Sequence, residues 1–331
     1  MDHRNDFLSI RDFSPFRIRE LLDLAADIKA SPSTYADSLK GKTLAMIFEK
    51  PSLRTRVTFD VGIQQLGGFS LYLSPAEISL GKRESVYDVA KNLERMVQAI
   101  MIRTFAHDIV ERLAEYASIP VINGLTDFSH PCQAMADFLT IEERKGHIAG
   151  LKVAFLGDGN NVAHSLMFAG AQLGANVWIS TPDGYEPNPQ AVHWARERSL
   201  QTGAIITLTN DPVEAAFDAD VVYTDVWTSM GQENEAEKRA RAFHPFQVDA
   251  RLFSNAKRDA IFMHCLPAHR GEEVTDEVID CAQSAVFQQA ENRLHAQKAI
   301  LYELMKGEVV LRPRRVVRGQ PVQELELAER G

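Results

Sequence analysis

The amino-acid sequence predicts an α/β protein with two doubly wound parallel-sheet domains. Short apolar runs of strand length alternate with segments whose apolar residues recur at helical spacing, which is typical of βα units. The alternation occurs twice, before and after residues 145–150. A chain of 331 residues is also long enough for about two domains.

The first domain is expected to cover residues 1–146. Gly67 and Gly68 separate a helical pattern from the strand-like run that follows, because glycine ends helices readily. The predicted strands of this domain are 43–48, 69–73, 99–103 and 121–124, and its predicted helices are 16–29, 59–66, 85–96 and 109–116.

The second domain is expected to cover residues 147–289, starting with a strand, a turn at 157–161 and a helix at 162–173. A last helix within 290–308 is expected to pack back on the first domain, and residues 309–331 are expected to form a solvated, flexible tail. The strand candidates here are 152–156, 175–180, 205–209, 221–224 and 260–264.

Composition and charge restrict the class of function. The hydrophobic fraction of 45% is that of an ordinary globular protein, and a net charge of −9 disfavours partners such as nucleic acid or an anionic membrane surface. No apolar stretch approaches the length of about 18 residues that spans a membrane, and the acidic N-terminus resembles no targeting segment. Three cysteines without paired spacing indicate a reducing compartment, so a cytoplasmic location is predicted.

The run from Ser52 to Arg56, Ser-Leu-Arg-Thr-Arg, stands between a predicted strand and a helical pattern. Backbone N–H groups and a positive helix dipole meet hydroxyl and guanidinium groups there, which is the arrangement that binds phosphate. An ordinary helix cap with solvated arginines is the competing interpretation. No glycine-rich run ending in Gly-Lys-Ser or Gly-Lys-Thr is present, so a small phosphorylated metabolite is the expected ligand.

Other polar clusters follow predicted strands, where ligands bind in open α/β sheets. They are Arg103, the run 130–133 (His-Pro-Cys-Gln), Asn161, the run 225–231 (Asp-Val-Trp-Thr-Ser-Met-Gly) and the run 264–267 (His-Cys-Leu-Pro).

In this order and spacing, these motifs resemble those of the ornithine carbamoyltransferases, within the aspartate/ornithine carbamoyltransferase superfamily, over about residues 7–304. The resemblance is closer to the biosynthetic enzymes of arginine synthesis than to the catabolic ones. It implies that the two domains are joined by interdomain helices, with the active site in the cleft between them. It also implies transfer of a carbamoyl group from carbamoyl phosphate to L-ornithine, giving citrulline and phosphate. It also implies a homotrimer and neither a cofactor nor a metal.

The resemblance assigns roles to individual residues. Arg103, His130, Asp225 and Cys265 would be catalytic. Ornithine would be bound by Asn161, Asp225, Ser229 and Met230, and residues 227–231 would close over the site as a flap. Carbamoyl phosphate would be bound by Ser52, Leu53, Arg54, Thr55, Arg103, His130, Pro131, Cys132, Gln133, Cys265, Leu266 and Arg293.

Two positions depart from the commonest family pattern: Leu53 replaces a threonine, and Ser79 stands where biosynthetic relatives often carry glutamine, in a loop expected to reach a neighbouring subunit. No lysine or arginine occurs between Asp225 and Glu235, which disfavours aspartate as the acceptor. Putrescine and N-acylornithine remain alternative acceptors.

Different classes of function also remain open. The run 157–162 partly matches a dinucleotide-binding fingerprint, with valine in place of the third glycine. His264, Cys265 and His269 could be imagined as metal ligands, although paired spacings are missing. A noncatalytic descendant of the transferase fold is a third alternative.

Overall fold

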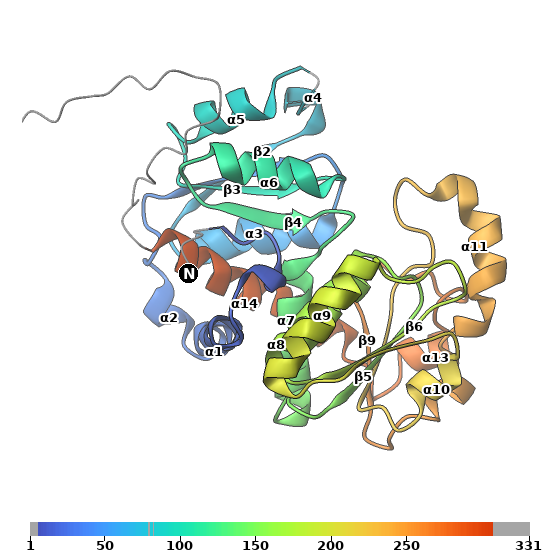
Figure 1. Ribbon diagram of the computed structural model, residues 1–331. Helices are drawn as coiled ribbons and strands as arrows, with labels where there is room; N and C mark the ends of the chain where they lie inside the picture. Colours follow the sequence, from blue (N-terminus) through green and yellow to red (C-terminus); the bar gives the residue numbers. More distant parts are fainter. Residues whose placement is uncertain (1–5, 79, 82, 307–331) are drawn as a thin grey trace, which may run out of the picture.

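The computed structural model describes residues 6–78, 80, 81 and 83–306. The fold contains two β-sheets, each made of parallel strands (Figure 1). The four-stranded sheet has the order β2-β1-β3-β4, and the five-stranded sheet has the order β7-β6-β5-β8-β9. The strands are β1 (Thr43–Phe48), β2 (Phe69–Leu73), β3 (Ala99–Arg103), β4 (Val121–Leu125), β5 (Lys152–Leu156), β6 (Asn176–Ser180), β7 (Ile206–Thr209), β8 (Val221–Thr224) and β9 (Ile261–His264).

Helices connect the strands and cover the sheets (Figure 1). Those before β5 are α1 (Pro15–Ala30), α2 (Pro32–Tyr35), α3 (Leu53–Gln65), α4 (Pro75–Ile78), α5 (Val86–Leu93), α6 (His107–Tyr116) and α7 (Pro131–Lys145). Those after β5 are α8 (Asn161–Leu173), α9 (Pro189–Thr202), α10 (Pro212–Ala216), α11 (Ala236–Phe243), α12 (Ala250–Phe253), α13 (Asp276–Ile279) and α14 (Val286–Met305).

The predicted fold class is confirmed, and the predicted strands are present within one residue of their expected bounds. Helix α14 starts at Val286, four residues before the predicted residue 290, and α3 already includes Leu53 to Arg56. The arginine motif therefore forms the N-cap and first turn of α3, consistent with its predicted place at the start of a helix. The predicted tail at 309–331 lies outside the described residues.

The strands are apolar on both faces because helices cover both faces of each sheet. In β1, Leu44, Met46 and Phe48 belong to one hydrophobic cluster, whereas Ala45 and Ile47 belong to another on the opposite face. The first of these clusters continues into the second sheet and its helices. A continuous core therefore fixes the two sheets relative to each other.

Helix α14 packs against α1, α3 and α7, so the end of the described chain returns to the first sheet's side of the molecule (Figure 1). Its contacts with β9 join it to the second sheet as well. No described helix combines the length and the apolar character needed to cross a membrane.

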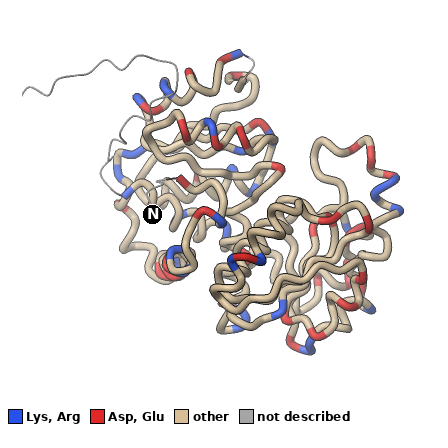
Figure 2. Tube along the Cα trace, in the orientation of Figure 1, with Lys and Arg blue, Asp and Glu red and all other residues tan. Residues whose placement is uncertain are grey.

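Charged residues lie mainly on the helices and loops, and the strands are almost free of them (Figure 2). Lys152 and Arg103 are the only Asp, Glu, Lys or Arg residues within the described strands. Lys152 begins β5 and is partly exposed, whereas Arg103 ends β3 and is buried. A buried guanidinium at the carboxyl end of a strand marks the place where the sheet can bind an anion.

Candidate active site

The first turn of α3 presents donors at the carboxyl edge of the first sheet. Ser52 is the N-cap residue, and its Oγ accepts a hydrogen bond of 3.2 Å from the backbone N–H of Thr55. The Leu53 side chain is 74% exposed, so this residue can offer the site only its backbone. Backbone N–H groups in the first turn of a helix have no intrahelical acceptor, and the helix dipole makes this end positive.

The two arginines of this motif point to different surroundings. The Arg54 side chain is half-buried, and burial lowers its pKa. The Arg56 guanidinium instead lies 4.0 Å from the centroid of the Tyr72 ring and is exposed. The position of Arg56 therefore does not support a role in phosphate binding, and phosphate binding by Arg54 stays a prediction.

Arg54, Arg103, His130 and Arg293 form what we call the cationic corner. Burial, followed by the nearby charges of Arg293 and Arg54, lowers the pKa of Arg103 to about 9. Burial, followed by Arg293, Arg103 and Arg54, lowers the pKa of His130 well below its ordinary value. The His130 ring is therefore neutral near pH 7. The three arginines around it repel one another, and a bound anion would reduce this repulsion.

The cationic corner also holds buried nitrogen atoms that have no hydrogen-bond partner. Among the described residues, Arg103 Nε, His130 Nδ1 and Arg293 Nε are buried without a hydrogen-bond partner. Buried polar atoms usually have hydrogen-bond partners, so three unpartnered nitrogens within one cluster indicate a ligand-binding site.

A buried network beneath this corner orients Gln133 and Arg293. Arg293 donates to Gln133 Oε1 at 2.6 Å and to Thr55 Oγ1 at 3.1 Å. The Gln133 amide nitrogen donates to Asp137 at 2.8 Å, and Asp137 also accepts from Gln289 at 2.7 Å and from the Tyr223 hydroxyl at 3.2 Å. Burial raises the pKa of Asp137 to about 7.

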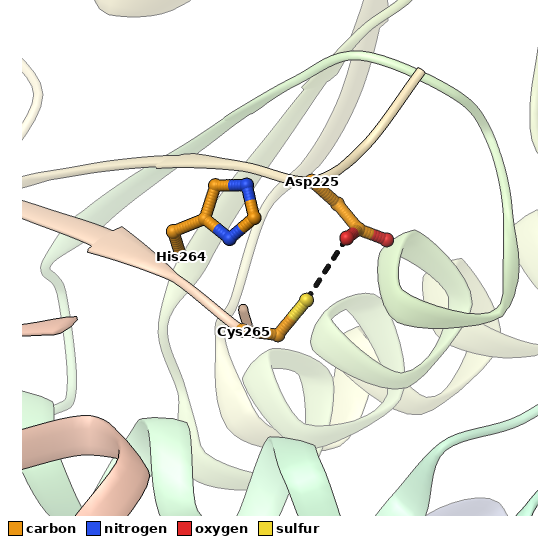
Figure 3. Close-up of side chains that lie close together, drawn as sticks. All are labelled: Asp225, His264 and Cys265. Atoms are coloured by element: carbon orange, nitrogen blue, oxygen red, sulfur yellow. Dashed lines mark hydrogen bonds between the residues drawn. The ribbon is translucent and has the colours of Figure 1, made fainter. Parts of the chain in front are cut away.

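On the second sheet's side of the site, Asp225, Cys265 and Asn160 form what we call the acidic corner, at the carboxyl ends of β8, β9 and β5. The Cys265 thiol donates to Asp225 Oδ1 at 3.0 Å (Figure 3). The Asn160 amide donates to Asp225 Oδ2 at 3.0 Å, and the backbone N–H of Val226 donates to Oδ1 at 2.8 Å. Burial, followed by the Asp225 charge, raises the pKa of Cys265 well above its ordinary value, so this cysteine is a thiol near pH 7.

The two corners lie close enough to influence each other. The charges of Cys265 and Asp225 act on the pKa of Arg54, and the charge of Arg54 acts on the pKa of Cys265. The structure therefore brings Arg54, Arg103, His130, Asp225 and Cys265 into one site, from segments far apart in the sequence.

The other predicted ornithine-binding residues have different surroundings. The Asn161 amide donates to the Thr126 carbonyl at 2.6 Å, so this side chain joins the two halves of the molecule. The Ser229 backbone N–H donates to Gln232, and Met230 is 44% exposed. At Gly231 a Cβ atom would lie 3.8 Å from the Phe105 ring, so the 227–231 loop reaches the first sheet's side of the cleft.

Three predicted carbamoyl-phosphate residues sit on segments with a structural role. Pro131 is the first residue of α7, where a missing N–H costs nothing. The Cys132 thiol lies 3.4 Å from the Asn123 carbonyl, and burial raises its pKa to about 12. Leu266 has a φ of 57°, which is uncommon for a residue with a side chain.

Sequence reasoning missed several partners of these residues. Asn160 is adjacent to the predicted residue Asn161, but nothing in the sequence indicates which of the two amides contacts Asp225. Asp137 lies four residues after Gln133, a spacing that places both on one helix face and could have suggested the contact. Gln289 and Tyr223 come from distant segments and carry no local signal.

The turn at 157–161 does not suit a dinucleotide. A Cβ at Gly159 would lie 2.3 Å from the Pro187 nitrogen, so the 185–187 segment already covers this turn. Asn160 Oδ1 accepts from the backbone N–H groups of Val162 and Ala163, which a pyrophosphate would otherwise bind. The turn serves the acidic corner instead.

Ligand atoms of Asp225, His264 and Cys265 lie within 4.8 Å of one another. The His264 ring nitrogens, however, already face protein partners: the Leu266 backbone N–H lies 2.8 Å from Nδ1, and Glu273 lies 3.1 Å from Nε2. With both nitrogens engaged, His264 has no free ligand atom for a metal, and the three residues do not form a ligand set.

Fold and site together define a two-domain carbamoyltransferase. Residues 5–143 match the family model for the aspartate/ornithine carbamoyltransferase carbamoyl-P binding domain, and residues 149–304 match that for the Asp/Orn binding domain. The chain belongs to the aspartate/ornithine carbamoyltransferase family.

Its relatives narrow the class further. The chain is 56% identical over 307 residues to the ornithine carbamoyltransferase of Thermococcus kodakarensis, covering 91% of this chain and 96% of that protein. It is 55% identical over 304 residues to the anabolic ornithine carbamoyltransferase of Pyrococcus furiosus, with the same two coverages. The solved ornithine carbamoyltransferase structure from Pyrococcus furiosus matches with a TM-score of 0.89 at 54% identity, covering 92% of this chain and 97% of that one.

Proposed function

We propose that this chain transfers the carbamoyl group of carbamoyl phosphate to the side-chain amine of L-ornithine, giving L-citrulline and phosphate for arginine biosynthesis. The observation that carries this proposal is that Arg54, Arg103 and Arg293 lie close to the Asp225–Cys265 pair in one site. A phosphorylated electrophile suits the first group, and a cationic amine suits the second.

The cationic corner binds the phosphate. Ser52, Arg54 and Thr55 contact its oxygens together with the Leu53 backbone N–H, and Arg103 and Arg293 supply the remaining positive charge. The geometry that supports this assignment is the capped start of α3 and the unsatisfied Arg103 and Arg293 nitrogens.

The carbamoyl end lies between the two corners. His130, Gln133, Arg103 and the Leu266 segment hold it, with Pro131 and Cys132 fixing the start of α7 beneath. Because its pKa is lowered well below the ordinary value, His130 acts as a neutral hydrogen-bond donor rather than as an acid. Donors around the carbonyl oxygen form an oxyanion site, where the loss of one donor typically costs about 3 to 4 kcal/mol of barrier.

The acidic corner receives ornithine. Asp225 and Cys265 orient the amine, while Asn161, Ser229 and the Met230 backbone bind the α-carboxylate and α-ammonium groups. Free in water, this amine has a pKa near 10.4, so delivering it neutral at pH 7 costs roughly 4 to 5 kcal/mol. Closure of the 227–231 loop removes water and lowers this cost.

The neutral amine attacks the carbamoyl carbon and forms the new C–N bond. The tetrahedral intermediate then breaks its C–O bond to phosphate, and the surplus amine proton leaves with the phosphate. Cys265 stays a thiol throughout, in keeping with its raised pKa. No step requires a cofactor or a metal.

We also propose that the protein is a homotrimer. Leu53, Val57 and Val61 are exposed at intervals of four residues, so they form one apolar stripe along α3. Phe69 and Leu71 of the neighbouring edge strand β2 are exposed as well. An apolar surface of this kind is typical of a protein–protein contact.

We further propose that residues 1–146 and 290–308 form the carbamoyl-phosphate domain and residues 147–289 form the ornithine domain. The packing of α14 on α1, α3 and α7 supports this division.

The three free cysteines support a cytoplasmic location, since oxidising compartments favour paired cysteines.

One steady-state assay tests this function. Purified protein is given carbamoyl phosphate with ornithine, putrescine, aspartate or N-acetylornithine, and the carbamoylated product is measured. We expect ornithine to have the highest kcat/KM. A higher value for another acceptor would overturn the substrate assignment, and no turnover with any of them would overturn the enzyme assignment.

A further inference from the structure

His264 and Glu273 form a fully buried pair that the reaction described above does not use. Both side chains have a relative exposure of 0%, and His264 Nε2 lies 3.1 Å from Glu273 Oε1. Burying a carboxylate is costly and seldom improves stability over apolar packing. The pair therefore calls for a role beyond holding the fold together.

The contacts of His264 determine its tautomer. The backbone N–H of Leu266 can only donate, and it lies 2.8 Å from His264 Nδ1, so Nδ1 accepts and carries no proton. In a neutral ring Nε2 must then carry the proton, and it donates to Glu273. Glu273 thus keeps His264 in the one tautomer that can bind Leu266.

Glu273 is itself firmly held. Its Oε1 also accepts a hydrogen bond of 2.6 Å from the backbone N–H of His269, and its backbone carbonyl accepts one of 2.9 Å from Val248. Glu273 Oε2 is buried without a partner. A carboxylate with one unsatisfied oxygen is a poor stabiliser, but it is a rigid acceptor for His264.

The segment that this pair holds carries the reactive side of the acidic corner. Leu266 adopts a φ of 57°, which costs free energy for a residue with a side chain and needs support from its surroundings. Cys265, between His264 and Leu266, directs its thiol to Asp225 at 3.0 Å (Figure 3). The His264 contact to the Leu266 N–H spans Cys265 and limits its movement.

We propose that Glu273 and His264 are positioning residues, which fix residues 264–267 through the Leu266 N–H and so keep the Cys265 thiol on Asp225. This inference rests on the proposed function, since its value to the protein lies in orienting the amine and the carbamoyl group. It is a role in the geometry of the site and involves no proton transfer to substrate.

Two substitutions separate the two contacts of the ring. In His264→Asn the amide oxygen can replace Nδ1 and accept from Leu266, but the side chain is too short to reach Glu273. In His264→Gln the amide nitrogen can replace Nε2 and donate to Glu273, but the contact with Leu266 is lost. Each variant loses one hydrogen bond, so they form a matched pair.

Two measurements are made on each variant. The first is the KM for both substrates and kcat, because a change that merely unfolds part of the sample lowers apparent kcat and leaves KM unchanged. The second is the rate of iodoacetamide alkylation at Cys265, with peptide mapping to distinguish it from Cys281. This rate does not depend on catalysis, so it tests the positioning role even if the transfer reaction is assigned wrongly.

We expect His264→Gln to raise both KM values about tenfold, and alkylation of Cys265 by a similar factor, since one hydrogen bond holds the segment. His264→Asn should change each quantity by less than about threefold. Glu272→Gln, at the exposed neighbour of Glu273, is the control and should match the wild type.

Equal effects of the two His264 variants would overturn the proposal, as would a His264→Gln protein with wild-type KM values and alkylation rate. If His264→Gln does not fold, Glu273→Ala gives the answer, because it frees the ring to change tautomer. Unchanged alkylation of Cys265 in Glu273→Ala would also overturn the proposal.

Discussion

The cationic corner and the acidic corner lie close together in one site, but they differ in how far their polar groups are already hydrogen-bonded. In the cationic corner, Arg103, His130 and Arg293 are buried with unpartnered nitrogens and with like charges as neighbours. In the acidic corner, Asp225 accepts hydrogen bonds from Cys265, Asn160 and Val226. The first corner is incomplete without an anion, whereas the second is already satisfied.

This difference predicts that ligand binding affects the stability of the protein more strongly in the cationic corner than in the acidic corner. Completing the cationic corner with phosphate removes repulsion that the folded protein otherwise carries, so ligand binding and folding should be strongly coupled there. In the acidic corner an incoming amine must replace existing partners, so binding should be weaker and depend more on geometry. Each prediction below tests one side of this contrast.

The largest effect is expected at Arg103. Arg103→Met should lower kcat/KM for carbamoyl phosphate by about 10³-fold, because a donor aimed at the developing charge is lost. The same change should stabilise the free protein by about 1 to 3 kcal/mol, because a buried cation is replaced by an apolar side chain. Steady-state kinetics and thermal unfolding, with and without phosphate, measure both effects.

Arg56→Met is the control, since Arg56 belongs to the same motif but stacks on Tyr72 and is exposed. It should leave the KM for carbamoyl phosphate within about threefold of the wild type. If Arg103→Met destabilised the free protein, the description of the cationic corner as strained would be wrong.

The next effect is expected at Asp225. Asp225→Asn keeps the shape but places an amide where Cys265 or Asn160 donates, and it removes the charge that attracts the amine. The kcat/KM for ornithine should fall roughly 100-fold, in line with the loss of hydrogen bonds to a charged group, while the KM for carbamoyl phosphate changes little. Asp183→Asn, at an exposed position, serves as the control. A larger effect on carbamoyl phosphate than on ornithine would contradict the division between the corners.

Asp137 beneath the cationic corner gives a smaller, pH-dependent effect. Burial raises its pKa from 3.8 in the unfolded chain to about 7 in the folded protein, so the folded protein binds this proton more tightly. Its contribution to stability is therefore full below pH 4 and is lost as the pH rises through 7. Asp137→Asn resembles the protonated form and should remove this dependence.

The measurement is the difference in the free energy of unfolding between wild type and Asp137→Asn at several pH values. Relative to the variant, the wild type should lose stability between about pH 4 and 7 and should change little at higher pH. Tyr223→Phe, which removes only the hydroxyl that contacts Asp137, should keep the pH dependence. A constant difference across this range would show that Asp137 does not titrate there.

The sequence predicted the strands well because each is a short, mainly apolar run bounded by turn residues, and strands such as 43–48 and 99–103 are also buried. It also identified Arg54, Arg103, His130, Asp225 and Cys265, since each lies at or just after the end of a strand and belongs to an ordered motif. It could not predict the partners that hold them. Gln289 lies 152 residues from Asp137, and such contacts depend on the packing of α14.

The helix start at Leu53 explains two further differences. Successive residues of a helix are rotated by about 100° about its axis, so the motif alone does not show which of its side chains lie toward the site. Here Arg54 is half-buried and interacts with Asp225 and Cys265, while Leu53 is exposed and Arg56 stacks on Tyr72. The orientation of these side chains depends on where the helix begins, which is fixed by the N-cap at Ser52.

The smallest catalytic effect is expected at Leu53, where the motif resemblance implies a threonine. Because the Leu53 side chain is 74% exposed, Leu53→Thr leaves the backbone N–H in place and should change the KM for carbamoyl phosphate by less than about twofold. The change shortens the apolar stripe with Val57 and Val61, so it should weaken self-association about tenfold if a second copy covers this stripe. Sedimentation velocity over a range of concentrations measures the association, and Val213→Thr, at an exposed position on α10, is the control. A tenfold lower KM with unchanged association would place the side chain of residue 53 within the cationic corner after all.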